Sequence, residues 1–126
     1  MKVVLDAGAL VAVERGDRNV VGVIERERRA GRMPVTHGGV VGQVWRDGGP
    51  RQAVLARALA GIQVRALDDT FGRRAGALLA RAGGSDVIDA AVVLLAADGD
   101  EILTSDLRDL AALVDAAGTQ ADVIPV

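Results

Sequence analysis

Several functional groups are absent from this chain or nearly so. It contains no cysteine, which excludes disulfides, thiolate metal sites and cysteine nucleophiles. Its large aromatic residues are one Trp and one Phe, too few for a surface that stacks nucleic-acid bases. Val3–Leu5 is interrupted at once by Asp6, so we expect no signal peptide, and the uncharged run Ala90–Ala97 is too short to span a bilayer. These absences favour a cytoplasmic protein without a membrane segment.

The residues that are present predict one globular domain, 1–126, with an unusual choice of charged side chains. Half of the 126 residues are apolar, enough for a core without covalent staples. Lys2 is the only lysine among 15 cations, and 13 of the 17 anions are Asp. Arg suits bidentate contacts with phosphate, and Asp suits metal ligation or helix capping. GC-rich coding DNA produces the same surplus, so composition alone supports no nucleic-acid function.

The apolar pattern predicts strands that alternate with helices along the whole chain. The expected strands are Lys2–Leu5, Met33–Thr36, Ile62–Leu67, Glu101–Thr104 and Asp122–Val126. The expected helices are Ala9–Arg15, Asn19–Ala30, Val40–Trp45, Arg51–Ala60, Thr70–Ala82, Asp86–Ala97 and Asp106–Ala117. Such alternation implies right-handed crossovers and a parallel sheet with helices on both faces, which is a three-layer α/β/α sandwich.

Carboxylates from distant parts of the chain are expected at one edge of this sheet. Asp6 ends the first strand, Asp106 follows the strand 101–104, and Asp86 begins the helix between them. Ligands bind at the carboxyl ends of parallel strands. Asp89 lies one helical turn after Asp86 and faces the same way. Because crowded carboxylates need a neutralising cation, the pattern predicts Mg²⁺ or Mn²⁺, which prefer oxygen ligands.

Helix capping is the competing explanation for these residues. Asp is a preferred N-cap residue, and Asp6, Asp86 and Asp106 each stand at the start of a helix, so any one alone is explained as a cap. Asp89 is harder to explain this way, because it enters a nearly apolar helix where an unpaired carboxylate is costly. Asp109 and Asp115 are expected to be solvated helix positions.

Other candidate residues have simple structural explanations. His37, the only histidine, is expected to be a loop or capping residue, with a general base as the alternative. Trp45 and Phe71 are expected in the core. Four arginines are possible contacts for RNA phosphates, although solvated helix faces explain each of them. These are Arg46, Arg51, Arg73 and Arg74.

Three segments together resemble the PIN domain family, in particular its small VapC-type toxins. Val3–Leu10 resembles the opening strand of the family with its first metal-site Asp. Ser85–Ala91 resembles the start of its buried helix, and Ile102–Leu110 resembles its Thr-x-Asp strand end and the helix that follows. The order, the spacing and the total length all match, and the resemblance covers the whole chain.

This resemblance implies a Mg²⁺- or Mn²⁺-dependent endoribonuclease that hydrolyses RNA phosphodiesters. In this resemblance, Asp6, Asp86 and Asp106 would be the metal ligands and would hold one or two ions. Thr104 or Ser105 would offer a hydroxyl. The resemblance also implies two partners: a small VapB-like antitoxin whose tail occludes the site, and commonly a second copy of the chain in a homodimer.

One position departs from the family pattern. The family usually places a Glu on the helix after the second strand, and here the matching stretch Val40–Arg46 has Gln43. A carboxamide can donate an oxygen to a metal, but it lacks the negative charge and cannot accept a proton. Asp89 could supply the missing charge. The alternative is therefore a catalytically impaired PIN domain that acts as a binding module.

Two further rivals predict different chemistry. A receiver-like α/β domain takes up phosphate on an Asp, but it clamps the phosphoryl group with a lysine late in the sequence, where this chain has none. A purely structural domain predicts that no metal is ordered among the three Asp residues.

Overall fold

The computed structural model describes all 126 residues, with five strands and seven helices in the predicted order. The strands are β1 (Val3–Leu5), β2 (Val35–His37), β3 (Gln63–Arg65), β4 (Glu101–Thr104) and β5 (Asp122–Pro125). The helices are α1 (Ala7–Glu14), α2 (Arg18–Arg29), α3 (Gly38–Val44), α4 (Pro50–Leu59), α5 (Asp69–Ala82), α6 (Val87–Leu94) and α7 (Leu107–Ala117). None of the helices combines the length and the apolar character that a membrane span requires.

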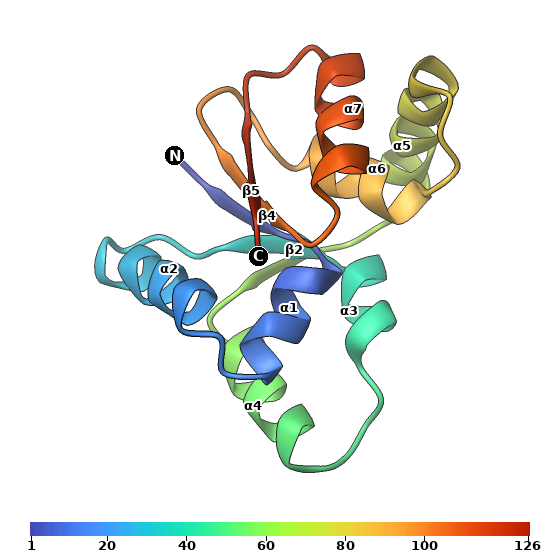
Figure 1. Ribbon diagram of the computed structural model, residues 1–126. Coiled ribbons are helices and arrows are strands. Elements are labelled where there is room, and N and C mark those ends of the chain that lie inside the picture. Colours follow the sequence, from blue (N-terminus) through green and yellow to red (C-terminus); the bar gives the residue numbers. More distant parts are fainter.

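All five strands form one parallel sheet in the order β3-β2-β1-β4-β5. Helices α1 to α4 lie on one side of this sheet, and α5, α6 and α7 lie together on the other (Figure 1). Parallel strands need long crossovers, and each crossover here carries at least one helix. The predicted three-layer α/β/α sandwich with a central parallel sheet is therefore confirmed.

The hydrophobic core lies between the central strands and the helices on both faces. Every residue of β1 is wholly buried, as expected for a β-branched run at the centre of a parallel sheet. In α6 the run Ala90–Val93 is also buried, which confirms the prediction from its nearly continuous apolar sequence. Trp45 and Phe71, predicted in the core, are partly buried and pack against it.

Two of the shifted element boundaries are explained by contacts with residues outside the element. Helix α6 ends at Leu94 rather than at Ala97, since the Asp100 carboxylate accepts a hydrogen bond from the Ala97 backbone N–H at 2.8 Å and draws the chain into a turn. Strand β2 extends to His37, because this residue still pairs with Arg65 of β3. The other predicted elements are confirmed, with bounds shifted by a few residues.

Candidate active site

The Asp residues predicted at the ends of the first and fourth strands lie at the same edge of the sheet. Strands β1 and β4 are parallel neighbours whose residues Leu5 and Leu103 pair, so the segments that follow them leave the sheet side by side. Asp6 follows β1 directly, and its backbone N–H donates to the Leu103 carbonyl at 3.2 Å. Asp106 follows β4 after one residue. Two candidate ligands that are far apart in the sequence are thus brought to one edge.

Thr104 links these two Asp residues. Its side chain is wholly buried, and its hydroxyl donates to Asp6 Oδ2 while accepting from the Asp106 backbone N–H at 2.8 Å. Asp6 is only 4% exposed, and its other oxygen, Oδ1, accepts from the Ala9 backbone N–H at 2.9 Å. Both oxygens of Asp6 therefore have donors within the protein, and these fix the orientation of the carboxylate.

Capping accounts for two of the three predicted Asp ligands but not for the third. Asp6 caps α1 through the bond to Ala9, and Asp86 caps α6, where its Oδ1 accepts from the Asp89 backbone N–H at 3.1 Å. Asp106 occupies the N-cap position of α7 without any side-chain capping bond. Side-chain capping is therefore weakest at Asp106, whose carboxyl group interacts with Asp109 instead.

Five carboxylates in this region repel one another. We call this group the acidic rim; it consists of Asp6, Asp86, Asp89, Asp106 and Asp109. Burial, followed by the charges of Asp86, Asp6, Asp106 and Asp109, raises the pKa of Asp89 to about 7. Burial, followed by the neighbouring carboxyl group of Asp109, raises the pKa of Asp106 as well. None of the six ion pairs in the protein involves these five residues. The rim therefore carries negative charge that no internal cation compensates.

Asp109 is a member of the acidic rim that the sequence did not single out. It is exposed, as predicted for a solvated helix position, yet its carboxyl group lies close enough to Asp106 to raise the pKa of that residue. With Asp86 and Asp89 it lines a hollow of about 290 Å³ between α5, α6 and α7. Its i, i+3 spacing from Asp106 is the sequence signal that could have identified it.

The acidic rim has the donor chemistry for a hard divalent cation but not a closed cage. Carboxylate oxygens are the ligands that Mg²⁺ and Mn²⁺ prefer. As the side chains stand, no three His, Asp or Glu residues are gathered closely enough to hold one ion. Asp86 and Asp106 are exposed side chains, which change rotamer readily. The predicted ligands therefore fit a divalent ion by charge and donor type, and they would have to converge to bind it.

Gln43 and Ser105 face a different hollow, of about 730 Å³, which none of the rim carboxylates lines. Gln43 is exposed on α3, and Ser105 follows β4. Gly8 also lines this hollow, and a Cβ atom at that position would overlap with the Ser105 side chain. The start of α1 can approach the end of β4 this closely only because residue 8 is Gly. Asp89 lines the same hollow as Asp86 and Asp109, whereas Gln43 does not.

His37 is a buried capping residue, which confirms its predicted capping role. Its Nδ1 accepts from the Gly39 backbone N–H at 3.1 Å at the start of α3, and its Nε2 lies 3.0 Å from the Ile88 carbonyl. This pattern assigns the neutral tautomer with a proton on Nε2. Burial lowers the pKa of His37, and the Phe71 ring packs edge-on against it at 5.9 Å between centroids. With both nitrogens engaged, His37 ties β2 to α6 and is not placed to act as a general base.

Comparisons with known proteins identify the fold. No protein-family model matches the sequence, and neither does any curated protein. Among solved structures, the chain is similar to one in the crystal structure of VapBC2 from Rickettsia felis bound to a DNA fragment from their promoter. The two chains are 11% identical, with a TM-score of 0.71 over 100% of this chain and 99% of the other. At this identity the likeness establishes the fold alone, and the chain has the PIN-like fold that the sequence predicted.

Proposed function

We propose that the protein is an endoribonuclease that requires Mg²⁺ or Mn²⁺ and hydrolyses RNA phosphodiesters. The observation that carries this proposal is the acidic rim, where three separate segments deliver five carboxylates and the pKa of Asp89 rises to about 7. Carboxylates crowded without a counter-charge destabilise a fold, and strongly perturbed pKa values are concentrated at functional sites. A divalent cation would offset that cost.

In this proposal Asp6, Asp86 and Asp106 bind the ion, and Asp89 supplies the charge that Gln43 lacks. A bound cation would lower the pKa of a water molecule for in-line attack and offset charge on the leaving oxygen. Thr104 holds the Asp6 carboxylate in one orientation through its buried hydroxyl. No covalent intermediate is needed, since no cysteine or activated serine accompanies the rim.

The cleavage test is best made with Asp106→Asn. Asp106 is exposed and makes no side-chain capping bond, so this change removes a charge with little risk to folding, unlike a change at the buried Asp6. Asp115→Asn, at an exposed position of the same helix, is the matched control. We expect wild type and the Asp115 variant to cleave RNA with Mg²⁺ or Mn²⁺, and the Asp106 variant to be inactive. Equal cleavage by both variants would contradict the assignment.

A catalytically impaired binding module is the second candidate, and the position of Gln43 favours it. Gln43 faces the hollow of Ser105 and adds no charge to the acidic rim. At an effective dielectric near 20, a charge about 4 Å from an ion is worth roughly 4 kcal/mol per unit of ion charge before desolvation. If the wild-type protein fails to cut RNA while Gln43→Glu restores cutting, the impaired reading is correct.

We also infer that the protein is the toxin of a toxin–antitoxin pair, with a small VapB-like antitoxin and a second copy of the chain as partners. The fold shared over the full length with a chain of the VapBC2 complex supports this inference. Expression of the chain alone should arrest growth, and co-expression of a small protein encoded next to its gene should relieve the arrest. Arrest that persists with the Asp106→Asn variant would separate toxicity from the acidic rim.

A further inference from the structure

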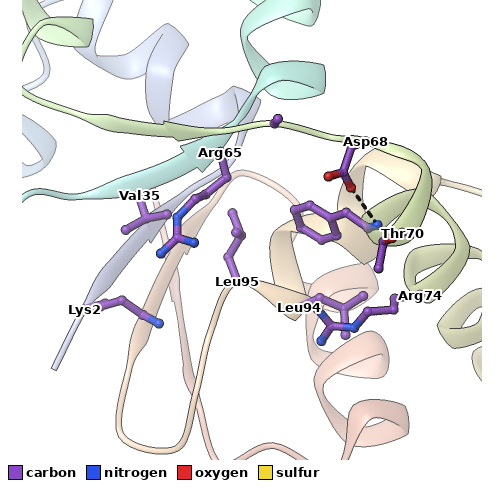
Figure 2. Close-up of a pocket in the computed structure, with 10 residues that line it drawn as sticks. Lys2, Val35, Arg65, Asp68, Thr70, Arg74, Leu94 and Leu95 are labelled. Atoms are coloured by element: carbon purple, nitrogen blue, oxygen red, sulfur yellow. Dashed lines mark hydrogen bonds between the residues drawn. The ribbon is translucent and has the colours of Figure 1, made fainter.

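A hollow of about 510 Å³ lies apart from the acidic rim and is lined by cations instead. We call it the basic pocket. Lys2, Arg65 and Arg74 line it, none of the rim carboxylates does, and Val35, Phe71, Leu94 and Leu95 give it apolar walls. The three cations are the residue just before β1, the last residue of β3 and a residue in the second turn of α5. Figure 2 shows Lys2 and Arg65 on one side and Arg74 with Leu94 on the other, with Leu95 between them.

The two guanidinium groups of the basic pocket have no counter-charge. Arg65 and Arg74 are exposed, and neither takes part in any of the six ion pairs of the protein. The one carboxylate in the lining, Asp68, caps α5 and accepts from the Phe71 backbone N–H at 2.9 Å (Figure 2). Lys2 is shared with Asp100 at 3.4 Å. The pocket therefore presents unpaired planar donors beside an apolar wall.

The preceding residue of α5, Arg73, has a carboxylate partner. Arg73 does not line the basic pocket, and its guanidinium bonds Asp69 one turn earlier at 2.9 Å. Arg73 and Arg74 are both exposed positions of one helix, so they share helix propensity and solvent access. They differ in what their guanidinium groups face: Arg73 pairs with Asp69, and Arg74 lines the pocket.

We propose that the basic pocket binds a nucleotide, with the phosphate between the cations and the base or ribose against the apolar wall. Arg forms bidentate hydrogen bonds with phosphate, and both Arg65 and Arg74 line this pocket. Phe71 and Leu95 line the pocket with apolar side chains, and Thr70 adds a hydroxyl to its lining. The volume lies within the range of about 300–1,000 Å³ that is usual for small-molecule sites.

The nucleotide in this pocket is either free or part of an RNA strand, and both present the same phosphate chemistry. The inference does not depend on the proposed nuclease activity, because no residue of the acidic rim takes part in it. It also makes use of Arg74, whose possible contact with phosphate the sequence suggested without an indication of place.

Calorimetric titration of the full chain in EDTA tests the proposal with adenosine monophosphate, adenosine and inorganic phosphate as probes. We expect saturable binding of the monophosphate and binding of adenosine weaker by about tenfold or more, the usual effect of a charge-assisted hydrogen bond. Arg74→Ala should weaken binding of the monophosphate by about tenfold, whereas Arg73→Ala should change it by less than about twofold.

A short single-stranded RNA then identifies the source of the nucleotide. An oligonucleotide that displaces adenosine monophosphate from the wild type, and binds more weakly to the Arg74 variant, indicates an RNA strand. An oligonucleotide that binds without displacing it indicates a free nucleotide. Equal weakening by Arg73→Ala and Arg74→Ala would overturn the proposal, since it would show a diffuse charge effect. Adenosine binding as tightly as its monophosphate, or no saturation at millimolar concentration, would overturn it too.

Discussion

Replacing Thr104 by Val tests whether the hydroxyl that joins Asp6 to Asp106 stabilises the protein. Valine has nearly the same shape, so the change removes two hydrogen bonds without opening a cavity. The donor to Asp6 Oδ2 is lost, and so is the acceptor for the Asp106 backbone N–H at 2.8 Å. Asp6 is 4% exposed and Thr104 is wholly buried, so water cannot easily replace the missing hydroxyl at Asp6.

The expected cost follows from these two partners. A hydrogen bond to a charged group is worth about 1.5–3 kcal/mol, and an unsatisfied backbone N–H that water partly reaches adds about 1 kcal/mol. We therefore expect Thr104→Val to lower the free energy of unfolding by about 2–4 kcal/mol. Thr104→Ser keeps the hydroxyl and loses one buried methyl group, which costs about 1 kcal/mol.

Urea unfolding followed by circular dichroism, at neutral pH and in EDTA, will measure both variants. The order of stability is the informative result, because packing and hydrogen bonding predict opposite orders. If burial of apolar atoms dominates, the Val variant is the more stable. A Val variant as stable as the Ser variant would refute the role assigned to this hydroxyl.

Three other features give further predictions. Arg32 bonds the wholly buried Glu27 at 2.9 and 3.0 Å, so Arg32→Ala should lower the free energy of unfolding at pH 7. The hydrogen bond from Arg32 lowers the pKa of Glu27, so in urea titrations this stabilisation is present above about pH 4.5 and is lost as the pH falls through the lower folded-state value. Burial lowers the pKa of His37. The contribution of neutral His37 to the free energy of unfolding is therefore complete above about pH 6.5 and is lost as the pH falls through the folded-state pKa. NMR titration of this single histidine will locate that pKa. Thermal unfolding should show a cost of about 1–3 kcal/mol for Gly8→Ala by overpacking, whereas Gly22→Ala, in open space on α2, should stabilise by about 0.5–1 kcal/mol.

Each of these expectations has a contrary result. An Arg32 variant as stable as the wild type would contradict Arg32 as the main partner of Glu27, whose carboxylate also lies 3.5 Å from Arg26. A His37 pKa at or above the ordinary value of about 6.5 would contradict its burial in the neutral form. Equal stability of the Gly8 and Gly22 variants would mean that α1 does not press against the end of β4.

The sequence predicted that Asp6 and Asp106 meet at one edge, because an alternation of strands and helices implies a parallel sheet. Each strand runs the same way, so a residue just after β1 and one just after β4 leave at the same end. The burial of α6 was predictable for a similar reason, since its apolar run leaves no face for water.

The roles within the acidic rim were not predictable in this way. Asp109 was expected to be solvated, and only the packing of α7 beside α6 brings its carboxyl group into the rim with Asp89. Gln43, which the sequence pattern places in the position of a family ligand, lines a neighbouring hollow with Ser105 and not the hollow of Asp86, Asp89 and Asp109. Both outcomes depend on how helices pack, and a helix pattern alone does not specify its neighbours.

The sequence by itself determined the alternation of strands and helices, the parallel sheet and the edge at which its carboxylates gather. These follow from periodicity, chain direction and turn residues, which are local. Only the tertiary structure decided that Thr104 fixes Asp6, that Asp89 is the most strongly perturbed acid, and that Arg65 and Arg74 face one pocket with Lys2. Hydrogen bonds and Coulomb interactions act through space over a few ångströms, so they depend on which distant segments meet.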